Sequence, residues 1–580
     1  MLYPQSNALR QRVTLPSFWD FRPDPAAEGK AAGWAEGFTG GRPIAVPASW
    51  NDLFDDVRDY LGDAWYQVHF DLPWGWEERR VHLRFGSVNY LAEVWLNGAR
   101  LGDHEGGHLP FGFDVTPHLR RERNRLVVRV NADLAPDRVP PGNVPPTPED
   151  SFMNLDYPAA SFDFFPFCGI HRPVLLYATP HEAITDLTVV TEIAGRDGVM
   201  RVRLECVPGG ATAARLTLSG HGAAVTDEVP LDSGEAEARL IVPGARLWSP
   251  ATPHLYDLTA ELVRGHEVID RYALPVGIRT VAVEGDALLL NGQPLKLTGF
   301  GRHEDFPLAG RGYLPVVIIK DYELMRWVGA NSFRTTHYPY SEMMMSLADR
   351  LGFLVIDETP AVGLFFHPNG LARRMALWEQ QTRELIARDK NHPAVIMWSL
   401  ANEPHNSRPE ARACFEAIFN LARALDPTRP LTFASHLGLQ DPALALCDVV
   451  CLNRYRGWYS EVGQLDAGCA ALAAELDAIH AQHPRPMILT EFGADTIPGL
   501  HAHPPEMFTE EYQAEMLARY VEVLNSKPYV VGQHVWNLCD FKTSQSIRRV
   551  GGFNYKGVFT RDRRPKLAAH RLRALWAQTR

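Results

Sequence analysis

Several features of membrane, secreted and nucleic-acid-binding proteins are missing from this sequence of 580 residues. It contains no run of about 18 apolar residues that could span a bilayer, so no membrane partner is expected. Its N-terminal segment does not combine basic residues with a long apolar run, so we expect no secretory leader. The formal net charge of −11 disfavours nucleic acid as a partner.

Cysteine is also scarce, with seven residues scattered along the chain. The number is odd, and the close spacing that is typical of disulfide frameworks and zinc sites is absent. We therefore expect reduced thiols, a cytoplasmic location and no structural metal.

What is present divides the chain into three parts. Residues 1–180 contain short alternating segments such as RRVHLRFGSV and NRLVVRVNA, separated by Gly, Asn and Pro, which predict an antiparallel β domain. Residues 181–276 contain a further series of short strands, such as MRVRLECV and EARLIVP, which is typical of an immunoglobulin-like β-sandwich. After residue 276, apolar runs alternate with helical patterns such as WEQQTRELIARDK.

Eight apolar runs in this third part are candidate parallel strands: LKLTGF, NSFRTT, FLVID, AVIMWSL, LTFAS, VVCLN, MILTE and VVGQHVW. Eight strands that alternate with helices predict a (β/α)8 TIM barrel over residues 277–580. The alternative, an open doubly wound sheet, would need a glycine-rich phosphate turn after its first strand. GFGRHED lacks the third glycine of such a turn.

Polar or aromatic residues follow every one of these runs. In a parallel barrel the carboxyl ends of the strands form one rim, where substrates bind. The residues are His303, His337, Asp357, Glu358, Asn402, Glu403, His436, Tyr455, Glu491 and Trp536. His303 and His337 could instead be core histidines, and Glu358 is interpreted as an ordinary strand-end acid.

Glu403, in VIMWSLANEP, and Glu491, in MILTEFG, are two carboxylates that this rim would bring together. Retaining cleavage of a glycosidic bond needs one carboxylic acid to protonate the leaving oxygen and one carboxylate to attack the anomeric carbon. We expect burial and the partner's charge to raise the pKa of Glu403, the candidate acid/base. Hydrogen bonds would keep Glu491, the candidate nucleophile, ionised. Asn402 could bond a sugar 2-hydroxyl, Tyr455 could orient the nucleophile, and Trp536 could stack on a sugar.

Between Tyr66 and Lys566 the chain resembles the β-glucuronidases of glycoside hydrolase family 2. The segments that carry the resemblance are FDFFPFCGIHRPV, GFGRHEDFPLAGRGY, ANSFRTTHYPY, VIDETPAVG, IARDKNHPAVIMWSLANEP, CLNRYRGWY, TEFGADT, VWNLCDFKTSQS and KGVFTRDRRPK. The resemblance implies a jelly-roll sugar-binding-like domain, an immunoglobulin-like β-sandwich and a catalytic TIM barrel. It also implies retaining hydrolysis of terminal β-glucuronides, on small molecules or oligosaccharides, without a cofactor. A homo-oligomer, dimer or tetramer, is expected by the same resemblance.

The resemblance also assigns residues, with Glu403 as the acid/base and Glu491 as the nucleophile. Substrate contacts are implied for Asp163, His337, Asn402, Tyr455, Tyr459, Trp536 and Arg549. Asp163 would reach into the barrel mouth from the first domain. Asn554 and Lys556 match the Asn-x-Lys motif that holds the carboxylate of a uronic acid in these enzymes. An amide and an ammonium group can give that carboxylate charge-assisted hydrogen bonds.

One departure from the family pattern lies next to this motif. The chain reads RRVGGFNYKG, with Phe553 as an extra residue directly after the two glycines. A bulge at either glycine would keep the contacts with a uronate, whereas a slipped register would displace Arg549 or Lys556. A β-galacturonidase or another family 2 β-glycosidase, such as a β-galactosidase-like enzyme, is therefore the alternative.

Two interpretations from other classes remain open. A carbohydrate-binding module without catalysis would not need both Glu403 and Glu491. A metal-dependent barrel hydrolase would use His303 and His337, but neither lies in an HxH or HExxH spacing.

The segment after the third barrel run is short. Only LFFHPNGLAR stands between Val362 and the next predicted helix, so any loop over the rim is short as well. Phe365 and Phe366 either line a site for the aglycone or close the rim of the barrel. A short loop favours an open site for bulky or extended aglycones.

Overall fold

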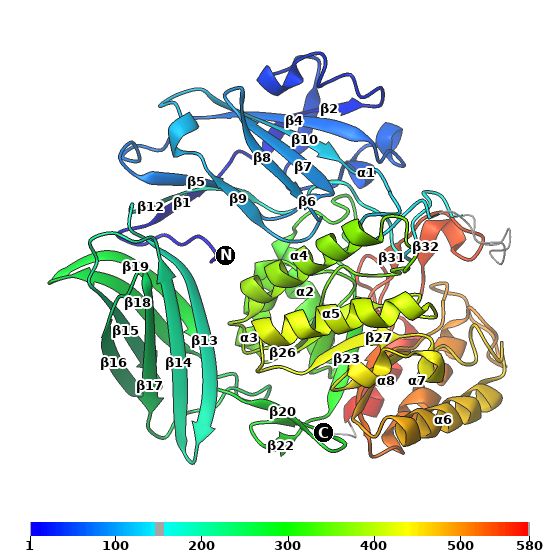
Figure 1. Ribbon diagram of the computed structural model, residues 1–580. Coiled ribbons are helices and arrows are strands. Elements are labelled where there is room, and N and C mark those ends of the chain that lie inside the picture. Colours follow the sequence, from blue (N-terminus) through cyan, green and yellow to red (C-terminus); the bar gives the residue numbers. More distant parts are fainter. Residues whose placement is uncertain (1, 145–155, 578–580) are drawn as a thin grey trace.

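The N-terminal domain, blue in Figure 1, is an antiparallel β structure. The computed structural model describes residues 2–144 and 156–577. In strand order, the smaller sheet contains β1 (Gln11–Thr14), β12 (Val174–Thr179), β5 (Arg80–Phe85) and β9 (Phe111–Asp114). The larger contains β3 (Arg42–Ala45), β2 (Phe18–Asp24), β4 (Asp63–Phe70), β10 (Asn124–Asn131), β7 (Leu91–Leu96) and β8 (Ala99–Glu105). The strand pair β6 (Val88–Asn89) and β11 (Gly169–Ile170) and the helix α1 (Trp50–Leu53) complete the domain.

The second domain is a sandwich of two antiparallel sheets, at the left of Figure 1. One sheet contains β13 (Ile184–Ala194), β14 (Asp197–Cys206) and β17 (Glu235–Val242). The other contains β16 (Ala223–Pro230), β15 (Ala213–Gly220), β18 (Tyr256–Arg264) and β19 (Glu267–Val276). Exposed and buried residues alternate without exception along β17, because one face of the sheet packs on the core and the other meets water.

The third domain contains a closed barrel of eight parallel strands. They are β23 (Leu297–Arg302), β24 (Ser332–Thr335), β25 (Leu354–Glu358), β26 (Val395–Asn402), β27 (Leu431–Ser435), β28 (Val450–Asn453), β29 (Met487–Glu491) and β30 (Val530–Val535). Every residue of β26 is buried, because helices cover the outside of the barrel and side chains fill its interior. This explains why a strand such as β26 is a largely apolar run, and the predicted fold class is confirmed.

Seven helices accompany the barrel within the described residues. They are α2 (Pro315–Val328), α3 (Glu342–Leu351), α4 (Leu371–Asp389), α5 (Pro409–Leu425), α6 (Leu465–Gln482), α7 (Glu510–Asn525) and α8 (Leu567–Ala577). A small sheet of β20 (Val281–Glu284), β21 (Ala287–Leu290) and β22 (Gln293–Pro294) precedes the barrel. Among the described residues, no helix is long and apolar enough to span a membrane.

A segment of the N-terminal domain reaches the mouth of the barrel. The backbone N–H of Phe165 donates to the carbonyl of Lys542 at 2.8 Å. The ring of Phe164 lies 5.1 Å from His303 and 6.2 Å from His337, between ring centroids. These contacts hold the neighbouring Asp163 beside the barrel rim.

Candidate active site

The two predicted catalytic glutamates stand at the carboxyl ends of barrel strands. Glu403 directly follows β26, and Glu491 is the last residue of β29. Asn402 ends β26 and Trp536 directly follows β30, so the same rim carries both of these predicted contacts. The Arg334 guanidinium donates both to Glu491 and to Oδ1 of Asn402, at 3.3 Å, so Glu491 and the segment that carries Glu403 belong to one site.

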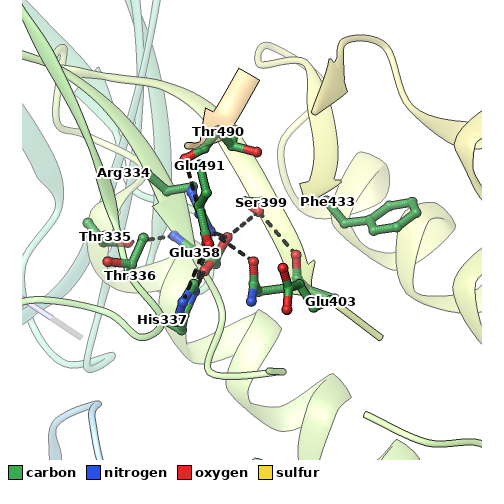
Figure 2. A network of polar contacts seen from close by, with 12 residues as sticks. Arg334, Thr335, Thr336, His337, Glu358, Ser399, Glu403, Phe433, Thr490 and Glu491 are labelled. Atoms are coloured by element: carbon green, nitrogen blue, oxygen red, sulfur yellow. Dashed lines mark hydrogen bonds and ion pairs between the residues drawn. The ribbon is translucent and has the colours of Figure 1, made fainter. Parts of the chain in front are cut away.

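Glu491 is held by donors on both of its oxygens, and Figure 2 shows the one from Arg334. The Tyr455 hydroxyl donates to Oε2 at 2.7 Å, and the Arg334 guanidinium donates to Oε1 at 2.5 Å. Nε2 of His337 lies 3.6 Å from Oε1. The carboxylate is therefore fixed in orientation, as a nucleophile requires.

A second carboxylate, Glu358, lies beneath the nucleophile. It is fully buried, accepts from Arg334 at 2.7 Å and from Ser399 Oγ at 2.7 Å, and shares a hydrogen bond of 2.8 Å with His337 Nδ1. The interpretation of Glu358 as an ordinary strand-end acid is wrong, because this carboxylate anchors the groups that hold Glu491. Sequence reasoning missed Arg334, although a charged residue in the buried β24 run was a signal that could have found it.

Glu403 has a different environment from Glu491. It is only half-buried, and its Oε1 accepts from Nδ2 of Asn453 at 2.8 Å. The same Asn453 amide donates to Oδ1 of Asn402 at 3.1 Å and so links the two residues. The backbone of Glu403 is left-handed, with φ of 43°, a conformation that costs a non-glycine residue on the order of 1 kcal/mol. Backbone strain of this kind is common at functional sites. Asn453, which holds both Glu403 and Asn402, was not predicted from the sequence.

Charge and burial oppose each other at Glu491. Burial raises the pKa of this carboxyl, Arg334 and His337 lower it, and the charge of Glu403 raises it again, which leaves the pKa above its ordinary value. We expected an ionised nucleophile held by hydrogen bonds, and Arg334 and His337 are the groups that oppose protonation of Glu491.

The predicted uronate contacts Asn554 and Lys556 form one cluster with three other predicted substrate contacts, Asp163, Tyr459 and Arg549. Arg549 Nε donates to Oδ1 of Asp163 at 2.9 Å, and a second contact of this ion pair joins Nη2 to Oδ2. Nδ2 of Asn554 donates to Oδ2 of Asp163 at 2.9 Å. The Tyr459 hydroxyl accepts from Nη2 of Arg549 at 3.1 Å and from Nζ of Lys556 at 2.8 Å.

Asp495, which sequence reasoning did not single out, anchors this cluster. It forms a buried ion pair with Lys556, and its Oδ2 lies 3.2 Å from Nη1 of Arg549. Its Oδ1 accepts from the backbone N–H of Tyr555 at 2.9 Å. Burial raises the pKa of Asp495, but Lys556 and Arg549 lower it by more, so the carboxylate stays ionised. Its place in the TEFGADT segment, four residues after Glu491, was the available signal.

The extra residue Phe553 does not break up this cluster. Gly551 and Gly552 both have left-handed backbones, with φ of 63° and 74°, which glycine adopts without strain. The strand β32 (Phe553–Asn554) then pairs with β31 (Phe541–Lys542). The glycine turn thus absorbs the added length, and Arg549 and Lys556 meet the same acid, Asp495.

The two histidines of the rim, His303 and His337, pack against aromatic side chains. His337 stacks on Trp536, with centroids 4.9 Å apart and planes inclined by 21°. His303 lies 4.2 Å from Phe541, and burial lowers its pKa far below the ordinary value, so it is neutral. Among residues 2–144 and 156–577, no group of three or more His, Cys, Asp or Glu side chains is arranged to hold a metal ion. His303 and His337 are thus packed among the rings of the rim.

Models of one protein family match nearly the whole chain. The model of the glycosyl hydrolases family 2 TIM barrel domain matches residues 281–580, and that of the family 2 sugar binding domain matches residues 13–180. A third model, described as glycosyl hydrolases family 2, matches residues 183–279.

Individual relatives agree with this match. A β-glucuronidase of Paenibacillus borealis is 40% identical over 601 residues, which cover 100% of this chain and 99% of that protein. A β-glucuronidase of Mus musculus is 38% identical, over 99% of this chain and 92% of that protein. The crystal structure of Ruminococcus gnavus β-glucuronidase superposes with a TM-score of 0.93 at 37% identity, over 100% of this chain and 98% of that one. The chain therefore belongs to glycosyl hydrolase family 2.

Proposed function

We propose that this chain is a retaining exo-β-glucuronidase that hydrolyses terminal β-D-glucuronides. The observation that carries the proposal is the cluster of Arg549, Asn554 and Lys556 on the rim that also holds Glu403 and Glu491. An ammonium, a guanidinium and an amide are suited to the carboxylate of a uronic acid. The relatives named as β-glucuronidases support the same substrate, and a Ruminococcus gnavus structure in complex with a C6-substituted uronic isofagomine has a TM-score of 0.93.

The proposed reaction is a double displacement. Glu491 attacks the anomeric carbon while Glu403 protonates the oxygen of the leaving group, which forms a covalent glucuronyl-enzyme. Water then attacks the same carbon, and Glu403 acts as the base that takes its proton. Arg334 and Tyr455 hold the nucleophile in line. Asn402, next to the acid/base, is the proposed contact for the sugar 2-hydroxyl.

A panel of four p-nitrophenyl β-glycosides tests this proposal. We expect hydrolysis of the glucuronide to exceed that of the galacturonide, glucoside and galactoside by kcat/KM. A preference for the galacturonide would be consistent with the proposed role of the cluster in binding a carboxylate, and would change only the sugar assigned as substrate. A preference for either neutral sugar would refute the proposed role of the cluster.

Removing the charge of Lys556 should abolish the uronide preference. In Lys556→Met the stem is kept and the ammonium is lost, so kcat/KM for the glucuronide should fall about 100-fold, the value of a strong charge-assisted hydrogen bond. Asp495 keeps Arg549 as a partner, so the fold should survive. The rate on the neutral glucoside should stay within about twofold of its own value.

Lys527→Met is the matched control, because Lys527 pairs with Asp477 at the surface. It should leave both rates unchanged. An equal loss on the glucuronide and the glucoside in Lys556→Met would contradict a role in carboxylate recognition, as would an unchanged glucuronide rate.

The pH profile should report the environment of Glu491. The free enzyme must hold this carboxyl ionised, so kcat/KM falls as the pH drops through its pKa. Because that pKa is raised, the acidic limb should lie above the ordinary glutamate value of about 4.3. The charge of Glu403 contributes to the raise, so Glu403→Gln should move the limb to lower pH. Measurement with p-nitrophenyl β-glucuronide, whose leaving group needs little acid assistance, checks both points, and a limb that moves upward would contradict them.

A further inference from the structure

A buried lysine joins the backbone segments that form the proposed uronate site. Lys566 stands directly before α8 and is 1% exposed. Its ammonium group donates to the carbonyl of Thr496 at 3.0 Å, to the carbonyl of Tyr555 at 2.9 Å and to Oδ1 of Asp540 at 2.8 Å. An ammonium group has three N–H donors, so the protein itself uses all of them. Lys566 is therefore placed to hold backbone and has no donor left for a sugar.

The two carbonyls belong to the segments on which the uronate contacts depend. Tyr555 is the middle residue of the Asn-x-Lys motif, and Thr496 follows Asp495, the acid that anchors the cluster. The two segments also bond directly. The backbone N–H of Thr496 donates to the carbonyl of Tyr555 at 3.0 Å, and the N–H of Tyr555 donates to Oδ1 of Asp495 at 2.9 Å. The buried lysine thus holds an acid segment, residues 494–496, against a motif segment, residues 554–557.

A second buried side chain bonds the same two segments. Gln513, on α7, is fully buried. Its Nε2 donates to the carbonyl of Ala494 at 3.2 Å in the acid segment, and to those of Lys556 at 3.1 Å and Gly557 at 3.2 Å in the motif segment. The fit is close, because a Cβ at Gly557 would lie 2.1 Å from the backbone nitrogen of Asp540. The backbone of the motif is therefore fixed by interior groups of the third domain.

This arrangement explains how the motif keeps its place after an extra residue. Phe553 lengthens the chain before Asn554, and the glycine turn absorbs that length. The bonds from Lys566 and Gln513 lie on the other side of the insertion, at residues 555–557. The place of the motif is therefore set by the chain that follows the insertion.

We infer that Lys566 is a positioning residue for recognition of the substrate carboxylate, an inference that rests on the proposed glucuronidase activity. It acts through the backbone, because it holds the carbonyl of Tyr555 between the two side chains that face the carboxylate, Asn554 and Lys556. A binding group must stand within about 0.5 Å of its productive place, and a misplacement of about 1 Å costs on the order of 100-fold. Lys566 thus contributes to the choice of a uronate over a neutral sugar, and little to bond cleavage.

Removing this ammonium group leaves no charge alone in the interior. Burial raises the pKa of Asp540 to about 7, and the charge of Lys566 opposes this rise. In Lys566→Met the carboxyl group therefore takes up a proton, which avoids the cost of a buried, unpaired charge. The carbonyl of Tyr555 keeps the N–H of Thr496 as a donor. The variant should fold, and its thermal unfolding midpoint checks this.

The test measures selectivity for a carboxylate. In Lys566→Met, kcat/KM for p-nitrophenyl β-glucuronide should fall about tenfold, through a higher KM, while the value for the neutral glucoside stays within about twofold. The inhibition constant of D-glucaro-1,5-lactone, which carries a carboxylate, should rise about tenfold, and that of the neutral D-glucono-1,5-lactone should not change. Lys566→Gln keeps a polar end but is too short for both carbonyls, so it should show the same loss and serves if the Met variant does not fold.

Lys390→Met is the matched control. Lys390 also pairs with a partly buried acid, Asp186, which belongs to the second domain. This variant loses an ion pair of the same kind away from the site. It should leave the ratio of the glucuronide and glucoside values unchanged, even where it lowers the unfolding midpoint.

A double variant separates positioning from general support of the fold. In Lys556→Met the ammonium that faces the carboxylate is already lost, so adding Lys566→Met should lower the glucuronide value by at most about threefold. A tenfold loss in both backgrounds, or equal losses on the glucuronide and the glucoside, would assign Lys566 to stability alone and overturn the inference. Unchanged selectivity in a folded Lys566 variant would overturn it as well. A wild-type chain that hydrolyses no glucuronide would refute the proposed function itself, and the wild-type assay shows this before any variant is compared.

Discussion

Replacing Glu491 by alanine should reduce kcat for p-nitrophenyl β-glucuronide by at least about 10⁴-fold, the scale of losing a covalent nucleophile. The change removes the attacking carboxylate and opens a space on the same face of the sugar. Arg334 keeps Glu358 as its partner, so no buried charge is left alone and the fold should persist. The thermal unfolding midpoint and the far-ultraviolet circular dichroism check this.

A small anion should distinguish a lost nucleophile from a damaged site. Azide can enter the vacated space and attack the anomeric carbon from the side opposite to the leaving group. The product of Glu491→Ala should then be the α-glucuronyl azide, with inverted configuration. Glu515→Ala, on α7 and paired with Arg519, is the control and should keep the native rate. Near-native turnover in Glu491→Ala would refute the assignment.

Replacing Glu403 by alanine should produce a loss that depends on the leaving group. Acid assistance contributes on the order of 10² to 10⁴ in rate, and a poor leaving group needs all of it. Methyl β-glucuronide should therefore lose about 10³-fold or more, whereas an activated aryl glucuronide should lose much less in the first step. The rates of a series of substituted phenyl glucuronides, plotted against the pKa of the phenol, check this.

The stereochemistry of azide rescue separates the two glutamates. In Glu403→Ala the nucleophile remains, so azide attacks the glucuronyl-enzyme from the acid/base side and gives the β-azide, with retained configuration. Glu410→Ala, an exposed position on α5, serves as the control. A loss that is the same for all leaving groups would mean that Glu403 does not donate the proton.

The fold could be predicted because burial leaves a clear pattern in the sequence. Barrel strands such as β26 are buried throughout and mostly apolar, since both of their faces are covered, and strands such as β17 alternate strictly, since one face meets water. The two candidate catalytic glutamates could be singled out because each stands at the carboxyl end of such a run. The loop before Asn554 could be predicted in part, because glycine readily forms a bulge. Both glycines before Phe553 indeed have a left-handed backbone.

The supporting residues of the site were harder to predict. Arg334 lies inside a buried strand, where its charge is tolerated only because Glu358 and Glu491 come from two other strands. Asp495 is ionised because it forms an ion pair with Lys556, which lies 61 residues away in the sequence. Closure of the barrel determines which charged residues become partners. A single sequence shows each charged residue but not the residue with which it pairs.

Asp163 makes substrate recognition depend on the contact between the first domain and the barrel. This residue belongs to a domain that contributes neither catalytic glutamate, yet its carboxylate accepts from Arg549 and Asn554 of the barrel. A change in the position of the first domain relative to the barrel would therefore move the Asp163 carboxylate and leave Glu403 and Glu491 in place. In an evolving lineage, substitutions far from the barrel could retune which sugars are accepted while the rate of bond cleavage is preserved. A barrel excised from its neighbour would lose the Asp163 carboxylate, and with it the acceptor for Arg549 and Asn554.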